Sequence, residues 1–252
     1  MGKIVAIGGG EIGRPGYPVE TRAIDKEIIR LTGKKHPKLL FLPTASNDNL
    51  LYVKVVKEHF GKRLGCRIDV LFLIREDLKK KEIQSQIRKK VLSSDIIYVG
   101  GGNTLRMMKV WRRSGLDSLL KDAYTQGKVL CGVSAGAVCW FRYGCSDSWK
   151  MKNPKAPYIK VKGLGLFNTI LCPHYDKEKG RKAGLKAMMK KTYGVAIAVD
   201  NCAAIEIVDK KYRIINSKKR AKAYKVYWKN NRFFSISLKK SSGFFPIEGF
   251  VV

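Results

Sequence analysis

A serine flanked by small residues at positions 132–136, Gly-Val-Ser-Ala-Gly, has the residue types and spacing for nucleophilic chemistry. This G-x-S-x-G pattern is typical of a nucleophile elbow, where small neighbours let a serine occupy a sharp turn between a strand and a helix. The context fits, because a strand-like apolar run (129–131) precedes it and a helix-like apolar run (137–141) follows it. A hydroxyl at such a tip, beside a helix N-terminus, could attack a carbonyl carbon. We therefore predict that Ser134 is a catalytic nucleophile.

A serine hydroxyl needs a base to take its proton, and the chain offers three histidines. His36 lies in a charged run and His59 on an amphipathic helix, so both are expected in contact with solvent. His174 follows the apolar run 166–172 at the end of a predicted strand. There it would share a sheet edge with Ser134, so by elimination we predict that His174 is the base.

A carboxylate is expected to hold the imidazole tautomer and to stabilise the imidazolium. Asp147 is the first choice, because it follows the serine closely, on the loop that leaves the predicted elbow helix. Asp176, two residues after the histidine, and Asp200, at the end of another predicted strand, are competing choices. The residues alone leave this position open.

Acyl transfer also needs two N–H donors that point at the oxyanion. Ala135, directly after the nucleophile, is expected to supply one. The run Gly-Gly-Gly-Asn-Thr at 100–104 ends a predicted strand and opens a helix, so its backbone is expected to supply the other. This run matches neither G-x-x-x-x-G-K-[ST] nor G-x-G-x-x-G, which disfavours a nucleotide site.

The elements that must position these groups alternate between apolar runs and charged segments of helical period. Such alternation predicts an α/β fold, a largely parallel sheet flanked by helices, with ligands at the carboxyl ends of the strands. Strand-like segments after residue 195 predict an antiparallel extension of the same sheet. We expect one α/β domain over 1–252, with 209–252 as the antiparallel extension. The predicted strands are 4–7, 39–42, 68–74, 96–99, 129–133, 195–199, 203–208, 212–215, 223–228 and 233–238, and the predicted helices are 20–31, 49–60, 78–92 and 104–111.

The composition indicates a compact protein with an unusual charge. The chain has 252 residues, of which 45% are hydrophobic, a content typical of globular domains rather than disordered chains. Its 51 Lys and Arg against 20 Asp and Glu give a net charge of +31, spread over both halves of the chain. Such a field attracts anions non-specifically, but the sequence has no RNP-like, helix-turn-helix or zinc-finger pattern, so no specific nucleic-acid partner is predicted.

Targeting and cofactor signals are weak throughout the sequence. No stretch approaches the roughly 18 apolar residues of a membrane span, and the first residues lack the pattern of a secretory signal. The six cysteines show no C-x-x-C spacing that would indicate a metal site or a disulfide framework. We expect a cytoplasmic protein with neither metal nor cofactor.

Taken together, the segments 100–104 and 132–137 and the pair Pro173-His174 resemble the dipeptidase E (aspartyl dipeptidase) and cyanophycinase family of serine peptidases. The resemblance extends to about residue 208 and implies a class I glutamine amidotransferase-like fold. It implies Ser134 as nucleophile, His174 as base, Asp147 as third member, and the backbones of Gly102 and Ala135 as oxyanion donors. In some relatives an acid after a later strand completes the triad, which keeps Asp200 open.

The resemblance implies a serine exopeptidase or dipeptidase that acts on short peptides, with a preference for N-terminal Asp. The alternatives are a cyanophycinase-like β-aspartyl peptidase, an esterase that uses the same triad, and a catalytically idle homologue that binds anions or nucleic acid. Selection of an acidic side chain needs a cation in the pocket. Basic residues near the motifs, Arg142, Lys177, Lys179 and Arg181, are too numerous for the sequence to assign one.

Overall fold

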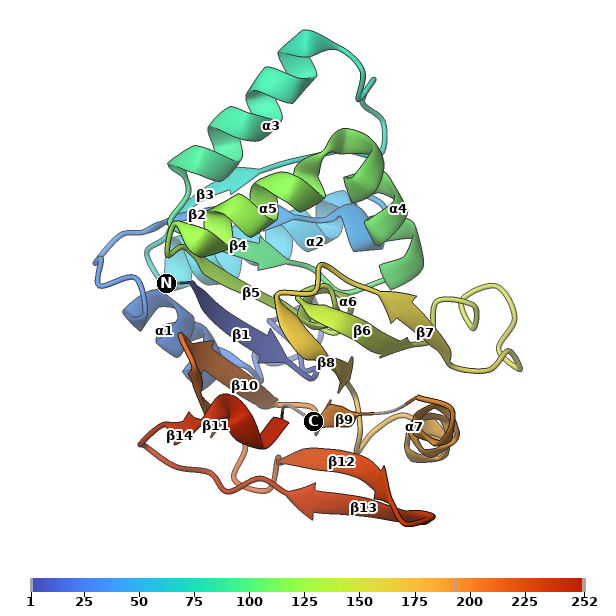
Figure 1. Cartoon of the computed structure of the whole chain (residues 1–252). Helices are drawn as coiled ribbons and strands as arrows, with labels where there is room; N and C mark the ends of the chain where they lie inside the picture. The colour runs from blue at the N-terminus through green and yellow to red at the C-terminus, as the bar shows by residue number, and fades with distance from the viewer. Residues whose placement is uncertain (1, 193, 251–252) are drawn as a thin grey trace.

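The computed structural model of the protein describes residues 2–192 and 194–250, and Figure 1 shows how the elements are arranged. The strands are β1 (Lys3–Ile7), β2 (Lys38–Leu42), β3 (Arg67–Val70), β4 (Ile96–Val99), β5 (Val129–Val133), β6 (Phe141–Ser146), β7 (Ile159–Lys162), β8 (Phe167–Cys172), β9 (Val195–Val199), β10 (Ala203–Val208), β11 (Lys211–Asn216), β12 (Ala223–Lys229), β13 (Arg232–Ser237) and β14 (Phe245–Pro246). The α-helices are α1 (Arg22–Arg30), α2 (Leu50–Val56), α3 (Lys81–Ser93), α4 (Thr104–Ser114), α5 (Leu116–Thr125), α6 (Ala135–Val138) and α7 (Arg181–Lys190). A π-helical segment, Lys57–Arg63, continues α2.

The first sheet has the strand order β14-β11-β10-β1-β5-β4-β2-β3. Strands β1 to β5 in this sheet are parallel to one another, as the alternation of strands and helices predicts. The central strands β4 and β5 are buried along their whole length, and buried parallel strands read as continuous apolar runs. This confirms the predicted α/β fold with a largely parallel sheet and antiparallel strands at one edge.

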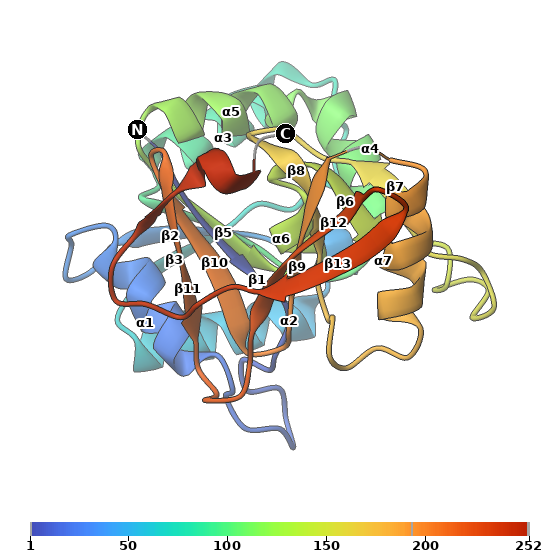
Figure 2. The same cartoon turned by 60° about the horizontal axis from the view of Figure 1, so that its bottom comes forward.

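Helices cover both faces of this sheet, with α3, α4 and α5 on one face and α1 and α2 on the other (Figure 2). Each helix turns an apolar stripe inward; Ile24 and Ile28 of α1, four residues apart, are both fully or almost fully buried. Helix α4 begins where the Asn103 side chain accepts the Arg106 N–H at 2.9 Å, and it ends at Gly115 with a φ of 68°. The helix therefore starts directly after the glycine run 100–102.

A second sheet, with the order β13-β12-β9-β8-β6-β7, corrects the prediction of a single sheet. The elbow helix, expected over 137–141, ends at Val138, and the segment 141–146 is strand β6 of this sheet. Of the C-terminal strands, β10, β11 and β14 extend the first sheet, whereas β12 and β13 join β9 in the second. Apolar periodicity identifies a strand but does not reveal its partners, because pairing depends on where the chain turns.

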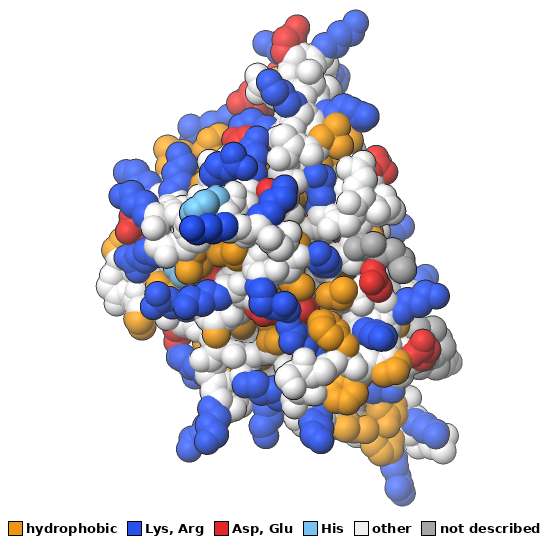
Figure 3. All heavy atoms as spheres, turned by 90° about the vertical axis from the view of Figure 1, so that its left-hand side faces the viewer, with side chains coloured by type: hydrophobic (Ala, Val, Ile, Leu, Met, Phe, Trp, Pro, Cys, Tyr) orange, Lys and Arg blue, Asp and Glu red, His pale blue; other side chains and the backbone are white. Residues whose placement is uncertain are grey.

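Lys and Arg side chains are scattered over the face of the molecule shown in Figure 3, with few acidic side chains among them. This agrees with a charge that is spread along the sequence. Over the described ranges 2–192 and 194–250, none of the helices has the length and apolar character needed to cross a bilayer.

Candidate active site

Ser134 lies in the turn between β5 and α6, as the elbow motif predicts. Its φ of 56° and ψ of −112° are strained for a residue with a side chain. The Ser134 N–H donates to the carbonyl of Ile7 at 3.0 Å, which fixes the turn against the end of β1. A side chain at Gly136 would overlap the backbone carbonyl of Val99, so only glycine fits where the helix meets β4. The local sequence therefore specifies this turn.

His174 lies beside the serine, two residues after the end of β8. Its Nε2 is 2.8 Å from the Ser134 Oγ, and its φ of 54° marks a second strained residue at the same edge. The His174 N–H donates to the carbonyl of Gly8 at 3.0 Å. The end of β1 thus holds both residues, although they lie on different sheets. The structure brings together the two residues that the sequence pairs as nucleophile and base.

Asn201, which the sequence motifs did not indicate, contacts the opposite edge of the imidazole, at Nδ1. Its Oδ1 is 2.7 Å from His174 Nδ1, and its own N–H donates to Asp176 Oδ1 at 2.8 Å. An amide oxygen only accepts hydrogen bonds, so it favours the tautomer with hydrogen on Nδ1. Nε2 is then unprotonated and free to take the serine proton.

The three aspartates proposed from the sequence lie elsewhere, and among the described residues none of them is hydrogen-bonded to the His174 ring. Asp147 Oδ2 is 3.8 Å from Nη2 of the buried Arg181. Asp176 holds the Asn201 backbone. Asp200 Oδ2 accepts the Lys222 N–H at 3.0 Å, and burial raises the pKa of its carboxyl.

The first choice, Asp147, is displaced because strand β6 separates it from the elbow helix. It is linked to the imidazole only indirectly, through a chain of charged side chains. Arg181, which faces Asp147, also pairs with Glu178, and Glu178 Oε1 is 4.0 Å from His174 Nε2. The position that the sequence assigned to an aspartate is therefore occupied by a neutral amide.

Of the other histidines, His36 is exposed, as predicted, but the prediction for His59 is wrong. His59 is buried, and its Nε2 is 2.7 Å from Oδ2 of the buried Asp25. The π-helical segment after α2 widens the turn there, so the spacing of an ordinary α-helix no longer tells which side faces inward.

Of the two predicted oxyanion donors, Ala135 directly follows the serine, whereas Gly102 lies in the loop after β4. Ala135 is the first residue of α6, where an N–H has no acceptor within its own helix. Gly102 has a φ of 139°, and in the described part of the chain its N–H has no hydrogen-bond acceptor. Its neighbour Gly101 lines the cleft instead, and donates its N–H to the Tyr52 hydroxyl at 3.3 Å.

A cleft of about 630 Å³ opens onto these groups. Its walls are mainly apolar or aromatic, with three charged side chains, Glu11, Arg14 and Glu20. Burial raises the pKa of Tyr52 in this wall to about 12, so its hydroxyl keeps its hydrogen at neutral pH. The lining residues are Gly10, Glu11, Ile12, Arg14, Pro15, Tyr17, Glu20, Ser46, Asn49, Leu51, Tyr52, Val55, Gly101, Val133, Ser134, His174 and Asn201.

The two cleft residues that the motifs did not indicate, Asn201 and Arg14, have only weak signals in the sequence. Asn201 directly follows Asp200, at the end of a predicted strand, and Arg14 follows the glycines after the first strand. Both are polar residues at carboxyl ends of strands, where ligands bind in this fold class. A carboxylate is the usual partner of a catalytic histidine, so the amide of Asn201 carries no comparable signal.

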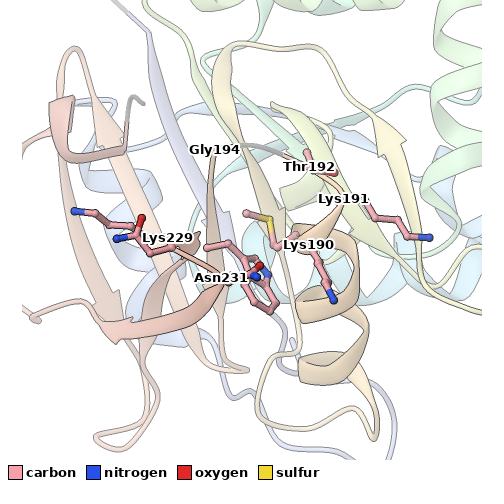
Figure 4. Close-up of a pocket in the computed structure, with 9 residues that line it drawn as sticks. Lys190, Lys191, Thr192, Gly194, Lys229 and Asn231 are labelled. Atoms are coloured by element: carbon pink, nitrogen blue, oxygen red, sulfur yellow. The ribbon is translucent and has the colours of Figure 1, made fainter.

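A separate cavity of about 470 Å³ lies between the end of α7 and the β12–β13 hairpin. Lys190, Lys191 and Lys229 line it, but their side chains point away from one another (Figure 4). They therefore do not converge on a ligand.

For metals, the described residues contain no group of three or more His, Cys, Asp or Glu side chains able to hold an ion.

Comparison with known proteins places this geometry in context. The sequence profile of Peptidase family S51 matches residues 4–215. The chain is 33% identical over 242 residues to the uncharacterized peptidase YgaJ of Bacillus subtilis (strain 168), covering 94% of this chain and 97% of that protein. It is 37% identical over 100 residues to the uncharacterized peptidase Lmo0363 of Listeria monocytogenes, covering 39% and 45%. A solved peptidase from an acI-B1 Actinobacterium shares the fold, with a TM-score of 0.72 at 17% identity over 98% of this chain and 97% of that one.

Proposed function

The chain belongs to peptidase family S51, the family of dipeptidase E and cyanophycinase, and from this premise we propose that it is a serine exopeptidase that hydrolyses dipeptides through Ser134, His174 and Asn201. The observation that carries the proposal is the 2.8 Å contact between Ser134 Oγ and His174 Nε2, at the floor of a cleft of small-molecule size. Family membership makes the protein a peptidase. The dipeptide substrate and the role of each residue are our proposal.

In the proposed reaction, the Ser134 Oγ attacks the peptide carbonyl while His174 Nε2 takes its proton. The N–H groups of Ala135 and Gly102 receive the oxyanion of the tetrahedral intermediate. The imidazolium then gives its proton to the leaving amine, and the C–N bond breaks to leave an acyl-enzyme on Ser134. Water attacks this ester with His174 again as base, which releases the acid and restores the serine.

Asn201 takes the place that an aspartate holds in many serine triads. Its amide oxygen orients the ring but carries no full charge, so it stabilises the imidazolium less than a carboxylate would. Asp176 keeps Asn201 in place through its backbone N–H. In this proposal Asn201 therefore acts mainly by selecting the imidazole tautomer and orientation.

A short peptide with both of its charges suits the cleft. Arg14 offers a cation for a carboxylate, and the negative charges of Glu11 and Glu20, although paired with Arg14 and Lys218, lie in the wall that an amino group would meet. The surrounding positive field would speed the arrival of acidic peptides without making the cleft selective. This combination favours small zwitterionic substrates over long chains.

The test is a panel of dipeptides led by Asp, Glu, Asn, Ala and Lys, together with β-Asp-Arg and an N-acetylated dipeptide. We expect the free α-linked dipeptides to release amino acids, with the Asp-led one fastest, and the acetylated one to react at least about tenfold more slowly, because one charged hydrogen bond is worth at least a factor of ten. Free amino acids are measured by mass spectrometry. Turnover of β-Asp-Arg alone would favour the cyanophycinase-like alternative, and no turnover of any peptide would favour the idle anion-binding homologue.

Changing Asn201 tests the proposed triad. Asn201→Ala is expected to lower kcat about tenfold, because one orienting hydrogen bond is worth roughly 1.4 kcal/mol. Asn201→Asp keeps a hydrogen-bond acceptor and adds a negative charge that favours the imidazolium. The variant should therefore remain active, and the acidic limb of its kcat–pH profile should move to higher pH. The measurement is kcat between pH 5 and 9 for both variants. An Asn201→Ala enzyme with wild-type kcat at every pH would remove Asn201 from the mechanism.

A further inference from the structure

Arg14 holds a distinctive position for a basic residue in this chain. The sequence contains 51 Lys and Arg, yet Arg14 is the one among the described residues that lines the cleft with Ser134 and His174. The basic residues near the motifs lie elsewhere. Arg142 lines another cavity, and Arg181 is buried against Glu178. Proximity in the sequence did not identify the cation of the cleft.

The guanidinium of Arg14 is held in place by its neighbours. Its Nε donates to Glu11 Oε2 at 2.8 Å, and its Nη2 donates to the other oxygen of the same carboxylate. Its Cζ lies 4.7 Å from the centre of the Tyr17 ring. Glu11 thus occupies the edge formed by Nε and Nη2, and the ring covers one face. A preoriented side chain loses less conformational entropy when it binds a ligand.

The opposite edge of Arg14 remains available. Within the described residues, its Nη1 has no hydrogen-bond partner, and its side chain is 57% exposed. A guanidinium has five N–H donors, so a second carboxylate can bind the edge formed by Nη1 and Nη2. Glu20, the other charged residue of this wall, already accepts from the Glu11 N–H at 3.2 Å and pairs with Lys218. Arg14 is therefore the charged donor of the cleft with unused capacity.

The rest of the wall is apolar beside this donor. Ile12, Leu51 and Val55 line the same cleft, and Leu51 is 67% exposed. An exposed leucine in the same cleft as the nucleophile gains from contact with an apolar group of the substrate. A peptide that carries both a carboxylate and an apolar side chain could contact the Arg14 guanidinium and the apolar wall together.

We infer that Arg14 is the specificity-determining residue of this cleft, and that it binds a carboxylate of the peptide substrate through its Nη1–Nη2 edge while Glu11 positions it. This inference rests on the proposed peptidase reaction and names its substrate class. The carboxylate has two possible sources, an acidic side chain of the N-terminal residue or the C-terminal carboxylate. The experiment separates them.

The test compares wild type, Arg14→Gln and Arg14→Lys on Asp-Leu, Asn-Leu and Asp-Leu-amide. If Arg14 binds the side chain, Arg14→Gln lowers kcat/KM for Asp-Leu and for the amide about 10- to 100-fold and leaves Asn-Leu within threefold of wild type. If Arg14 binds the C-terminal carboxylate, Arg14→Gln lowers kcat/KM for Asp-Leu and Asn-Leu but not for Asp-Leu-amide. Arg14→Lys keeps the positive charge but loses the paired N–H donors of the guanidinium, so its kcat/KM should lie between those of wild type and Arg14→Gln.

Binding gives a readout that does not depend on turnover. In the Ser134→Ala background, calorimetry should show the same selective loss of affinity for Asp-Leu when Arg14→Gln is added. Arg142→Gln, an exposed arginine that lines a different cavity, is the matched control and should behave as wild type. An equal loss of affinity for all three peptides, or an unchanged affinity for all three, would overturn the role of Arg14. Absence of turnover with selective binding intact would count against the proposed reaction alone.

Discussion

Ser134→Ala is expected to lower kcat on the best dipeptide by about 10⁶-fold, because loss of the nucleophile removes the acyl-enzyme route altogether. The Ser134 hydroxyl is held 2.8 Å from His174 Nε2. Once it is removed, the elbow offers no other side chain that could act as nucleophile at this position. The remaining oxyanion donors and cleft would support only weak catalysis of attack by water. The measurement is release of free amino acids by wild type and variant at equal concentration.

The same pair of proteins allows a chemical test of the nucleophile. A serine-directed organophosphonate should add its phosphonyl group to wild type at Ser134, with release of its leaving group, and leave the Ser134→Ala variant unlabelled. Ser85→Ala, an exposed position on α3, is the matched control and should keep full activity. Turnover by Ser134→Ala within tenfold of wild type would mean that another group performs the attack.

Gly9→Ala is expected to lower kcat by at least about 10²-fold while leaving the fold intact, because misplacement of a catalytic group by about 1 Å has an effect of this size. A Cβ at Gly9 would overlap Asn201 Oδ1 and lie 2.5 Å from His174 Nδ1. The φ of Gly9 lies outside the left-handed region, so the backbone itself accepts alanine. The methyl would displace the imidazole and its partner, and both must move to make room.

Thermal unfolding separates this effect from loss of stability. The overlapping atoms belong to side chains at a cleft, so the variant should keep a melting temperature within a few degrees of wild type. Gly249→Ala serves as the control, because nothing lies within 4 Å of its added methyl. Full activity of Gly9→Ala would show that the contact between Asn201 and His174 is not needed for catalysis.

Much of the first sheet could be predicted from the sequence because its strands are buried on both faces. The segments 96–99 and 129–133 are continuous apolar runs, and each coincides with a strand of the structure. The predicted helix 137–141 extends too far because the four residues of α6 lead into β6 through the apolar residues 139–141, without a polar break. Periodicity cannot separate such short runs.

The active-site predictions divide in the same way. Ser134 and His174 could be named as candidates because each has a local signature, an elbow motif and a position after a strand. The partner of the imidazole Nδ1 could not, since its identity depends on which side chain the fold brings to that nitrogen. Asp147, Asp176 and Asp200 were all reasonable by chemistry, yet the structure places Asn201 there.

The sequence by itself determined most strands of the first sheet and the strained turn at Ser134, and it indicated His174 as the candidate base. These features arise from residues that are neighbours along the chain, through small side chains at the turn and apolar periodicity in the elements. Only the tertiary structure decided the partner of the imidazole and the cation of the cleft. Asn201 lies 27 residues from His174, and His174 lies 40 from Ser134, so their meeting depends on how two sheets join at the end of β1.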